Sequence, residues 1–329
     1  MKKITLGFSI LAAAGIFVAG CNKKVTAAPV ADTEFQSTID ATYAASIITD
    51  IDMICGFLGE GAYPKFVSPV AGSQGTITVL NNTTTPQSAS ITFGDPTHPV
   101  SCLDGKTRTG SIVMTYSFTD INSNYYRDYG FIGNIGLNSY VVDGYSVDDS
   151  VSTHVGQIAL KNLAASANPN PAAVKLKWSI NGYINIRNIA DPTKNMAWVG
   201  SLNKTLANTA QLAPNNTTAI TWTAAIVNYD GSFHGFTPGN VPYTYTISTA
   251  TPLVKNYTCS PDKVIGVSTT PSITPVNSEF HPFIGGITSF TTSTKEPRAI
   301  DYGLSGGTPC DNSGSITIKG ISYNVDFKK

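Results

Sequence analysis

The feature that most constrains this fold is the alternation of apolar and small polar side chains along most of the chain. After residue 70, apolar residues recur at every second position of short segments that clusters of Gly, Pro, Asn and Asp separate. A period of two places alternate side chains on opposite faces of a strand. The clearest segments are 77–79, 89–93, 112–118, 196–198, 220–226 and 241–247. Sequential strands of this kind predict an all-β fold, a long antiparallel meander built as a sandwich or as a curved half-barrel sheet.

One segment tests how far this pattern can be followed. In VKLKWSINGYINI, residues 174–186, the dipeptide Asn181-Gly182 is a hairpin signal, but a turn there would place Trp178 opposite Asn185. If the segment is one strand, its apolar residues all share one face. The sequence therefore predicts a single unbroken strand.

The last segment, SITIKGISYNVDF, behaves differently. Its apolar residues change parity after Ile318. A two-residue turn at 319–320 restores one apolar face, because it pairs Ile318 with Ile321 and Ile316 with Tyr323. This segment is predicted to be a hairpin.

One helix is predicted near the N-terminus, within residues 33–59. Apolar residues recur there at steps of three and four, which places them on one stripe of a helix. The stripe consists of Phe35, Ile39, Tyr43, Ile47, Ile51, Ile54 and Leu58. Thr33 with Gln36 fits a capping box, and Gly56 or Gly59 offers an end. We expect the helix to pack on the β-rich domain, residues 70–329, as one sheet or two sub-sheets.

The first residues form an export signal. Residues 1–20 comprise a short basic start and an apolar stretch that is too short for a comfortable membrane span. Small residues then lead into Cys21, in the pattern of a bacterial lipobox. The sequence predicts acylation of Cys21, so that lipid chains such as diacylglycerol and palmitate anchor the protein without a membrane helix. Residues 21–32 would form a lipidated tether.

The residues after Cys21 suggest where the anchor is inserted. Asn22 stands where an aspartate would favour retention in the inner membrane, so we expect the outer membrane. Lys23-Lys24 occupy the place of the acidic cluster that accompanies surface display, which favours the periplasmic face.

The amino-acid composition limits the kinds of partner that the protein can bind. The 21 basic and 21 acidic residues balance, and 13% of residues are charged, so no basic field is present to bind nucleic acid. Four cysteines follow Cys21, an even number that is compatible with two disulfides in an exported protein. Proximity favours Cys55 with Cys102 and Cys259 with Cys310, and buried thiols are the alternative.

Four stretches resemble a recurring set of uncharacterised Bacteroidota outer-membrane lipoproteins. They are CLDGKTRTGSIVMTY (102–116), YVVDGYSV (140–147), EPRAIDYG (296–303) and CDNSGSITIKGISYNVDF (310–327). The resemblance spans most of residues 100–327. It implies a long β meander that ends in a cysteine and a short hairpin. No activity is established for that set, so the resemblance implies no catalytic residue.

The sequence contains only weak matches to catalytic and metal-binding motifs. Gly303 to Gly307 matches the G-x-S-x-G of a nucleophile elbow at Ser305, but a hairpin follows and no histidine lies downstream. A calcium-loop-like start at 120–124 lacks the required glycine and glutamate. The four histidines, at 98, 154, 234 and 281, lack metal-ligand spacing. We therefore predict no enzyme activity, metal or cofactor. Asp149-Ser150-Val151 resembles an O-glycosylation sequon with Ser150 as acceptor.

Three functions fit these observations. The leading hypothesis is a membrane-anchored envelope lipoprotein with a non-enzymatic structural or protein-interaction role. The second is a carrier that holds a lipid or other apolar ligand in a β groove under the helix. The third is a glycan-capture lipoprotein that uses some of its 15 tyrosines and its 3 tryptophans, Trp178, Trp198 and Trp222, as stacking platforms. All three tryptophans share the apolar parity of their strands, so we expect them to be buried.

Overall fold

The structure is a computed structural model of the 329-residue chain. It describes residues 32–59, 76–81, 86–102, 106–119, 125–151, 154–155, 158–163, 176–207, 226–256, 283–303 and 313–327. The chain divides into two compact units, Met1–Thr33 and Glu34–Lys329. The helix and all the described strands belong to the second unit.

Most strands of the second unit form one 17-stranded sheet in which every pairing is antiparallel. The strands are β1 (Thr76–Asn81), β2 (Gln87–Thr92), β3 (Gly94–Asp95), β4 (His98–Ser101), β5 (Thr107–Phe118), β6 (Phe131–Val142), β7 (Tyr145–Asp148), β10 (Ile158–Asn162), β11 (Lys177–Asn188), β12 (Met196–Leu206), β13 (Ile226–Thr237), β14 (Val241–Ile247), β15 (Leu253–Asn256), β16 (Ile287–Thr292), β17 (Arg298–Asp301), β18 (Ser313–Ile318) and β19 (Ile321–Asp326). A separate ribbon pairs β8 (Ser150–Val151) with β9 (His154–Val155), and a short 3-10 helix, η1, spans Pro192–Lys194. The predicted all-β fold with one helix is confirmed.

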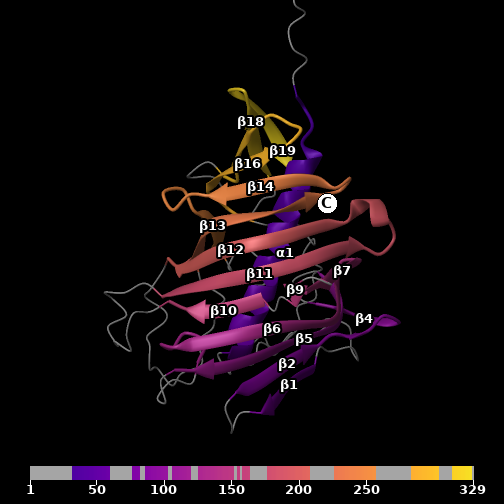
Figure 1. The fold of residues 1–329 in the computed structure, drawn as a ribbon, viewed down its shortest axis with the longest axis vertical. Coiled ribbons are helices and arrows are strands. Elements are labelled where there is room, and N and C mark those ends of the chain that lie inside the picture. The colour runs from indigo at the N-terminus through magenta and orange to yellow at the C-terminus, as the bar shows by residue number, and fades with distance from the viewer. Residues whose placement is uncertain are drawn as a thin grey trace, which may run out of the picture. The chain divides into compact units, whose positions relative to one another are not determined.

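The sheet runs continuously from one edge to the other. From β1 it passes through β2, β5 and β6, and both β7 and β10 then bridge β6 to β11. It continues through β12, β13, β14, β16, β17 and β18 to β19. In Figure 1 the strands are stacked along the length of the helix α1 (Gln36–Gly59) and cross it. These 17 strands thus form a single sheet that follows one helix along its length.

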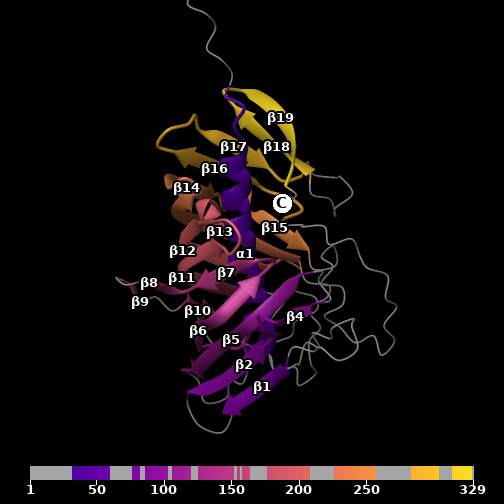
Figure 2. The same cartoon turned by 90° about the vertical axis from the view of Figure 1, so that its right-hand side faces the viewer.

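The helix is enclosed to a greater degree than its stripe predicted. Every described side chain from Asp40 to Leu58 is buried, including those that face away from the apolar stripe. Figure 2 shows α1 running through the middle of the sheet, with β12 on one side and β15 on the other. The expected packing of the helix on the β-rich domain is confirmed, and the burial extends beyond the apolar stripe. Residues of β5 and β12 reach α1 at Asp50 and Asp52, on two different sides of the helix.

The ends of the helix follow from local chemistry. The Glu34 side chain accepts hydrogen bonds from the Ser37 backbone N–H at 2.8 Å and from the Ser37 hydroxyl at 3.0 Å. An acidic side chain thereby satisfies an N-terminal donor of the helix, the role that the sequence analysis gave to Thr33. The helix ends at Gly59, one of the two predicted positions.

Both strand predictions are confirmed. β11 runs through Asn181-Gly182 without a turn, with Trp178 and Ile184 fully buried. In the β18–β19 hairpin, Ile318 pairs with Ile321 and Ile316 with Tyr323, as predicted. Lys319 and Gly320 have φ values of +52° and +80°, the left-handed conformations that a tight two-residue hairpin turn requires.

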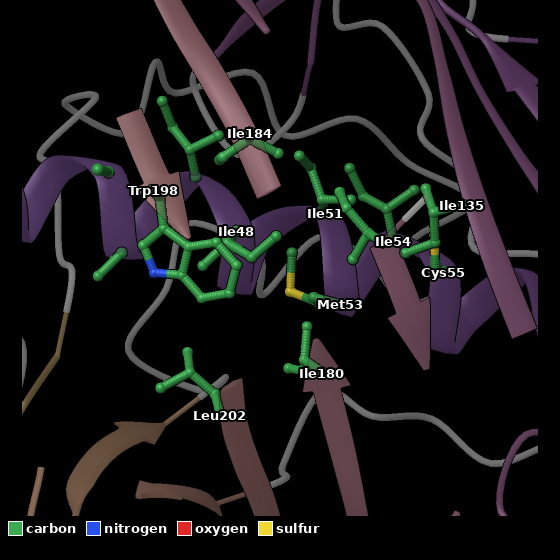
Figure 3. Close-up of a cluster of buried hydrophobic side chains, with 14 of the residues drawn as sticks. Ile48, Ile51, Met53, Ile54, Cys55, Ile135, Ile180, Ile184, Trp198 and Leu202 are labelled. Atoms are coloured by element: carbon green, nitrogen blue, oxygen red, sulfur yellow. The ribbon is translucent and has the colours of Figure 1, made fainter. Parts of the chain in front are cut away.

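The core lies between α1 and the inner face of the sheet. In Figure 3, Ile48, Ile51 and Ile54 of the helix lie among side chains of β6, β11 and β12. Trp198 and Ile184 are fully buried in this cluster. The space between the helix and these strands is thus filled by side chains of the protein itself.

Candidate functional site

The most unusual feature of the interior is a pair of aspartates on α1, Asp50 and Asp52. Both are in the buried section of the helix. Residues two apart on a helix point roughly 200° away from each other. The surrounding sheet must therefore supply positive charge on two opposite sides of α1.

Asp50 is neutralised by the start of β5. Its carboxylate accepts from the Arg108 guanidinium at 2.8 Å and from the Lys106 ammonium at 2.9 Å. Burial acts to raise the pKa of Asp50, but the charges of Arg108, Lys106 and the buried Lys255 outweigh it and hold that pKa well below its usual range. Arg108 Nε also donates to the Tyr140 hydroxyl at 3.2 Å.

Asp52 is neutralised from the other side by Lys204 of β12. The Lys204 Nζ lies 2.7 and 2.9 Å from the two carboxylate oxygens. The hydroxyls of Tyr126 and Tyr229 donate to the same carboxylate at 2.9 and 3.4 Å. Lys204 is 1% exposed and Asp52 is 0% exposed, so this pair is removed from water.

Aromatic rings surround the Lys204 ammonium. Its Nζ lies 4.6 Å from the ring centre of Tyr126 and 4.9 Å from that of Trp178. The two rings stack on each other, and the Trp178 indole N–H donates to the Tyr126 carbonyl at 2.9 Å. Cation–π contact adds to the ion pair in this desolvated place.

A third polar group lies near the start of α1. The buried Arg298 of β17 donates to the Glu34 carbonyl at 2.9 Å and lies 3.4 Å from the Glu34 carboxylate. About two turns further along, the Thr42 hydroxyl bonds to that of Tyr302, which in turn bonds to Tyr245 of β14. These contacts join the beginning of the helix to the last strands of the sheet.

These residues were not predicted from the sequence, although a signal was present. Lys204, Lys255 and Arg298 each occupy the parity of their strand that faces the core. A cation at an inward position needs a buried anion, and α1 supplies aspartates among apolar neighbours. Because each carboxylate is held by fixed partners and shielded from solvent, the arrangement secures α1 in the sheet.

The predicted Cys55–Cys102 disulfide is wrong. Both residues are buried thiols. Cys55 lies on α1 near Ile135 of β6 (Figure 3), whereas the Cys102 thiol donates to the Val100 carbonyl at 3.8 Å. Burial, together with the nearby Asp52, raises the pKa of the Cys55 thiol well above its usual value, which makes it a poor nucleophile.

Other predicted residues fall on different parts of the chain. Trp178 and Trp198 are fully buried, as expected from their parity. Ser150 begins the short strand β8. His98 lies in an exposed turn where Asp95 accepts from its backbone N–H at 3.0 Å, and His234 lies on the exposed face of β13.

Several predictions lie outside the described residues. They concern the signal peptide, Cys21, Cys259, Cys310, Ser305, Trp222, His281 and the loop at 120–124. Among the residues that are described, no group of three or more His, Cys, Asp or Glu is placed to hold a metal ion. Within the same part of the chain, no helix has the length and apolar character needed to cross a membrane.

The outer face of the sheet carries a long row of small uncharged side chains, here called the outer row. Its members are in register across twelve strands, and none of them is buried. They are Ser88, Thr115, Asn134, Ala159, Asn181, Ser201, Ser232, Thr246, Ser289, Ala299, Thr317 and Ser322. The charged side chains described above are thus buried around α1, whereas the outer row contains no charged side chain.

Comparison of the chain with protein-family models, curated proteins and solved structures finds no match. The resemblance to Bacteroidota lipoproteins therefore stays a prediction.

Proposed function

We propose that this protein is an envelope lipoprotein, anchored through acylated Cys21 at the periplasmic face of the outer membrane, with a non-enzymatic structural or protein-interaction role. The anchor is supported by the order of basic start, apolar stretch, small residues and cysteine at the N-terminus. The role is supported by the interior of the folded unit.

The observation that carries this proposal is the position of α1. A carrier with a curved sheet needs an apolar space on the concave side for its ligand. In this fold α1 lies there, and Asp50 and Asp52 fix it to opposite sides of the sheet. A ligand in that place would have to displace a helix held by two buried charge clusters.

The same interior argues against the two other functions. The carrier loses support because helix and strands share one continuous core. The glycan-capture function loses two of its three tryptophan platforms, since Trp178 and Trp198 have no exposed surface.

Metabolic labelling with a palmitate analogue tests the anchor. We expect the full-length chain, produced in an exporting bacterium, to carry the label and to fractionate with outer membranes. Cys21→Ser should lose the label, whereas Cys55→Ala, which changes a cysteine of the folded unit, should keep it. A wild-type chain without the label would overturn the anchor.

Native mass spectrometry of residues 22–329, exported and purified without detergent, tests the role. We expect a mass that the polypeptide accounts for without any bound ligand. A stoichiometric lipid adduct would favour the carrier, and a glycan adduct would favour glycan capture.

A further inference from the structure

The last strand of the sheet, β19, has an apolar face that its own chain covers incompletely. In β18 the inward residues Ile316 and Ile318 are 0% and 3% exposed. In β19 the residues opposite them differ, since Tyr323 is half-buried and Ile321 is 54% exposed. Among the described strands, β19 pairs with β18 alone. It is thus an edge strand with apolar side chains next to its open side.

The hairpin register shows which backbone groups face that open side. The residues that flank a two-residue turn, Ile318 and Ile321, exchange both of their backbone hydrogen bonds. The pattern alternates along an antiparallel pair. The N–H and C=O groups of Ser322 and Asn324 therefore point away from β18, toward the open edge.

The part of β19 from Ile321 to Val325, before Asp326, lacks the usual protection of an edge. Natural edge strands discourage further pairing with proline, lysine or a bulge. Between Ile321 and Val325 there is no proline and no charged residue, and the pairing with β18 is regular. Such an edge is open to another strand.

We propose that β19 pairs antiparallel with β19 of a second copy of this chain, about a two-fold axis at Tyr323. This register makes Ser322 of each copy exchange backbone hydrogen bonds with Asn324 of the other. It places Tyr323 opposite its counterpart and Ile321 opposite Val325 of the second copy. A shift by one residue would set apolar side chains opposite Ser322 and Asn324 and lose the common face.

The entry point of the chain favours the same partner. Phe35, just before α1, contacts Tyr323 with ring centres 5.2 Å apart. Rotation about an axis perpendicular to the sheet keeps both inner faces on one side, so both chains enter their folded units next to the seam and on the same side. Two copies anchored in one membrane can therefore meet in this orientation, and confinement raises their effective concentration. That last step rests on the proposed anchor, whereas the pairing itself does not.

Cysteine crosslinking of the soluble chain, residues 22–329, tests the register. Directly opposed positions of an antiparallel pair are close enough for a disulfide. Tyr323→Cys should give a disulfide-linked dimer on mild oxidation. Ile321→Cys is the matched control, because it is the more exposed position but faces residue 325 of the second copy. The Ile321→Cys, Val325→Cys double variant should link again.

Sedimentation of the unmodified chain provides a second measurement that needs no cysteine. We expect a reversible dimer, and Asn324→Pro should weaken it by about tenfold or more, because each copy loses an N–H donor at the edge. Buried Trp178 and Trp198 report by fluorescence that the variant is folded. A monomer at all concentrations, or equal crosslinking at 321 and 323, would overturn the pairing. The acyl label on Cys21 and the ligand-free mass are read independently, so failure of the pairing is distinguishable from failure of the proposed function.

Discussion

Lys204 occupies a strand position that the alternation assigns to an apolar residue. Met196, Trp198 and Leu202 share its parity and are all buried. The ammonium is tolerated there because Asp52 neutralises it and the rings of Tyr126 and Trp178 surround it. A buried ion pair adds little stability relative to an apolar pair, but it is costly to break from one side.

We therefore expect Lys204→Met to lower the free energy of unfolding by roughly 3–5 kcal/mol, since it leaves the Asp52 carboxylate buried without a cation. The double variant Asp52→Leu, Lys204→Met should regain most of this loss. Urea unfolding followed by tryptophan fluorescence measures both. Arg187→Ala, which breaks a pair with Asp148 at the surface, should cost less than about 1 kcal/mol. Equal losses in the single and double variants would contradict the buried pair.

At the scale of elements, the helix was predicted with nearly correct bounds, 33–59 against Gln36–Gly59, but the burial of its faces away from the apolar stripe was not predicted. Many of the positions away from the apolar stripe hold alanine, serine or threonine, which form no second apolar stripe. Ser46 and Thr49 donate to carbonyls of their own helix at 2.7 and 3.1 Å, so they need no outside partner. Small side chains whose hydroxyls bond to their own helix can be buried without a polar partner on another element.

For the strands too, some features could be predicted from the sequence and others could not. Parity alone predicted the unbroken β11 and the register of the last hairpin, because a shift of one residue exposes every apolar side chain. The bridging of β6 to β11 by both β7 and β10 could not be predicted, because alternation does not identify the partner of a strand. The charge clusters were missed for a related reason, since Asp52 and Lys204 are 152 residues apart.

Two glycines near the end of α1 allow a matched test of packing. A Cβ on Gly59 would lie 2.9 Å from Tyr126 Cβ and 3.2 Å from Met114 Cε, whereas one on Gly56 would lie 3.5 Å from the Tyr126 ring. Gly59→Ala should thus cost about 1–3 kcal/mol through overpacking. Gly56→Ala should be neutral or stabilise by up to about 1 kcal/mol, because alanine favours the helix. Thermal unfolding of the two variants compares them, and equal effects would contradict this close contact.

At the scale of the whole molecule, we expect the stability of the fold at low pH to depend on Asp50. A carboxyl whose pKa is lower in the folded state stabilises the protein above its unfolded pKa, near 3.8, and loses that contribution as pH falls toward the folded value. We expect stability to change little through this group between neutral pH and about pH 4, and to decline below that. Asp50→Asn should be less stable at neutral pH and should show a shallower decline in acid.

Urea unfolding at a series of pH values measures this decline. Asp148→Asn is the matched control, because it removes a carboxylate of a surface pair. An acid decline of the same slope in wild type and Asp50→Asn would show that Asp50 is not its source.

The contacts at the start of α1 set an order for folding. Glu34 and Thr42 are among the first described residues of the chain, yet their partners, Arg298 and Tyr302, lie close to its end, and Tyr302 in turn stacks on Phe327. These polar contacts of Glu34 and Thr42 therefore cannot form during synthesis until nearly the whole polypeptide exists. Contacts so distant in sequence make folding slow. The proposed export fits this order, because a chain that completes its core late would still be open when it enters a secretion channel.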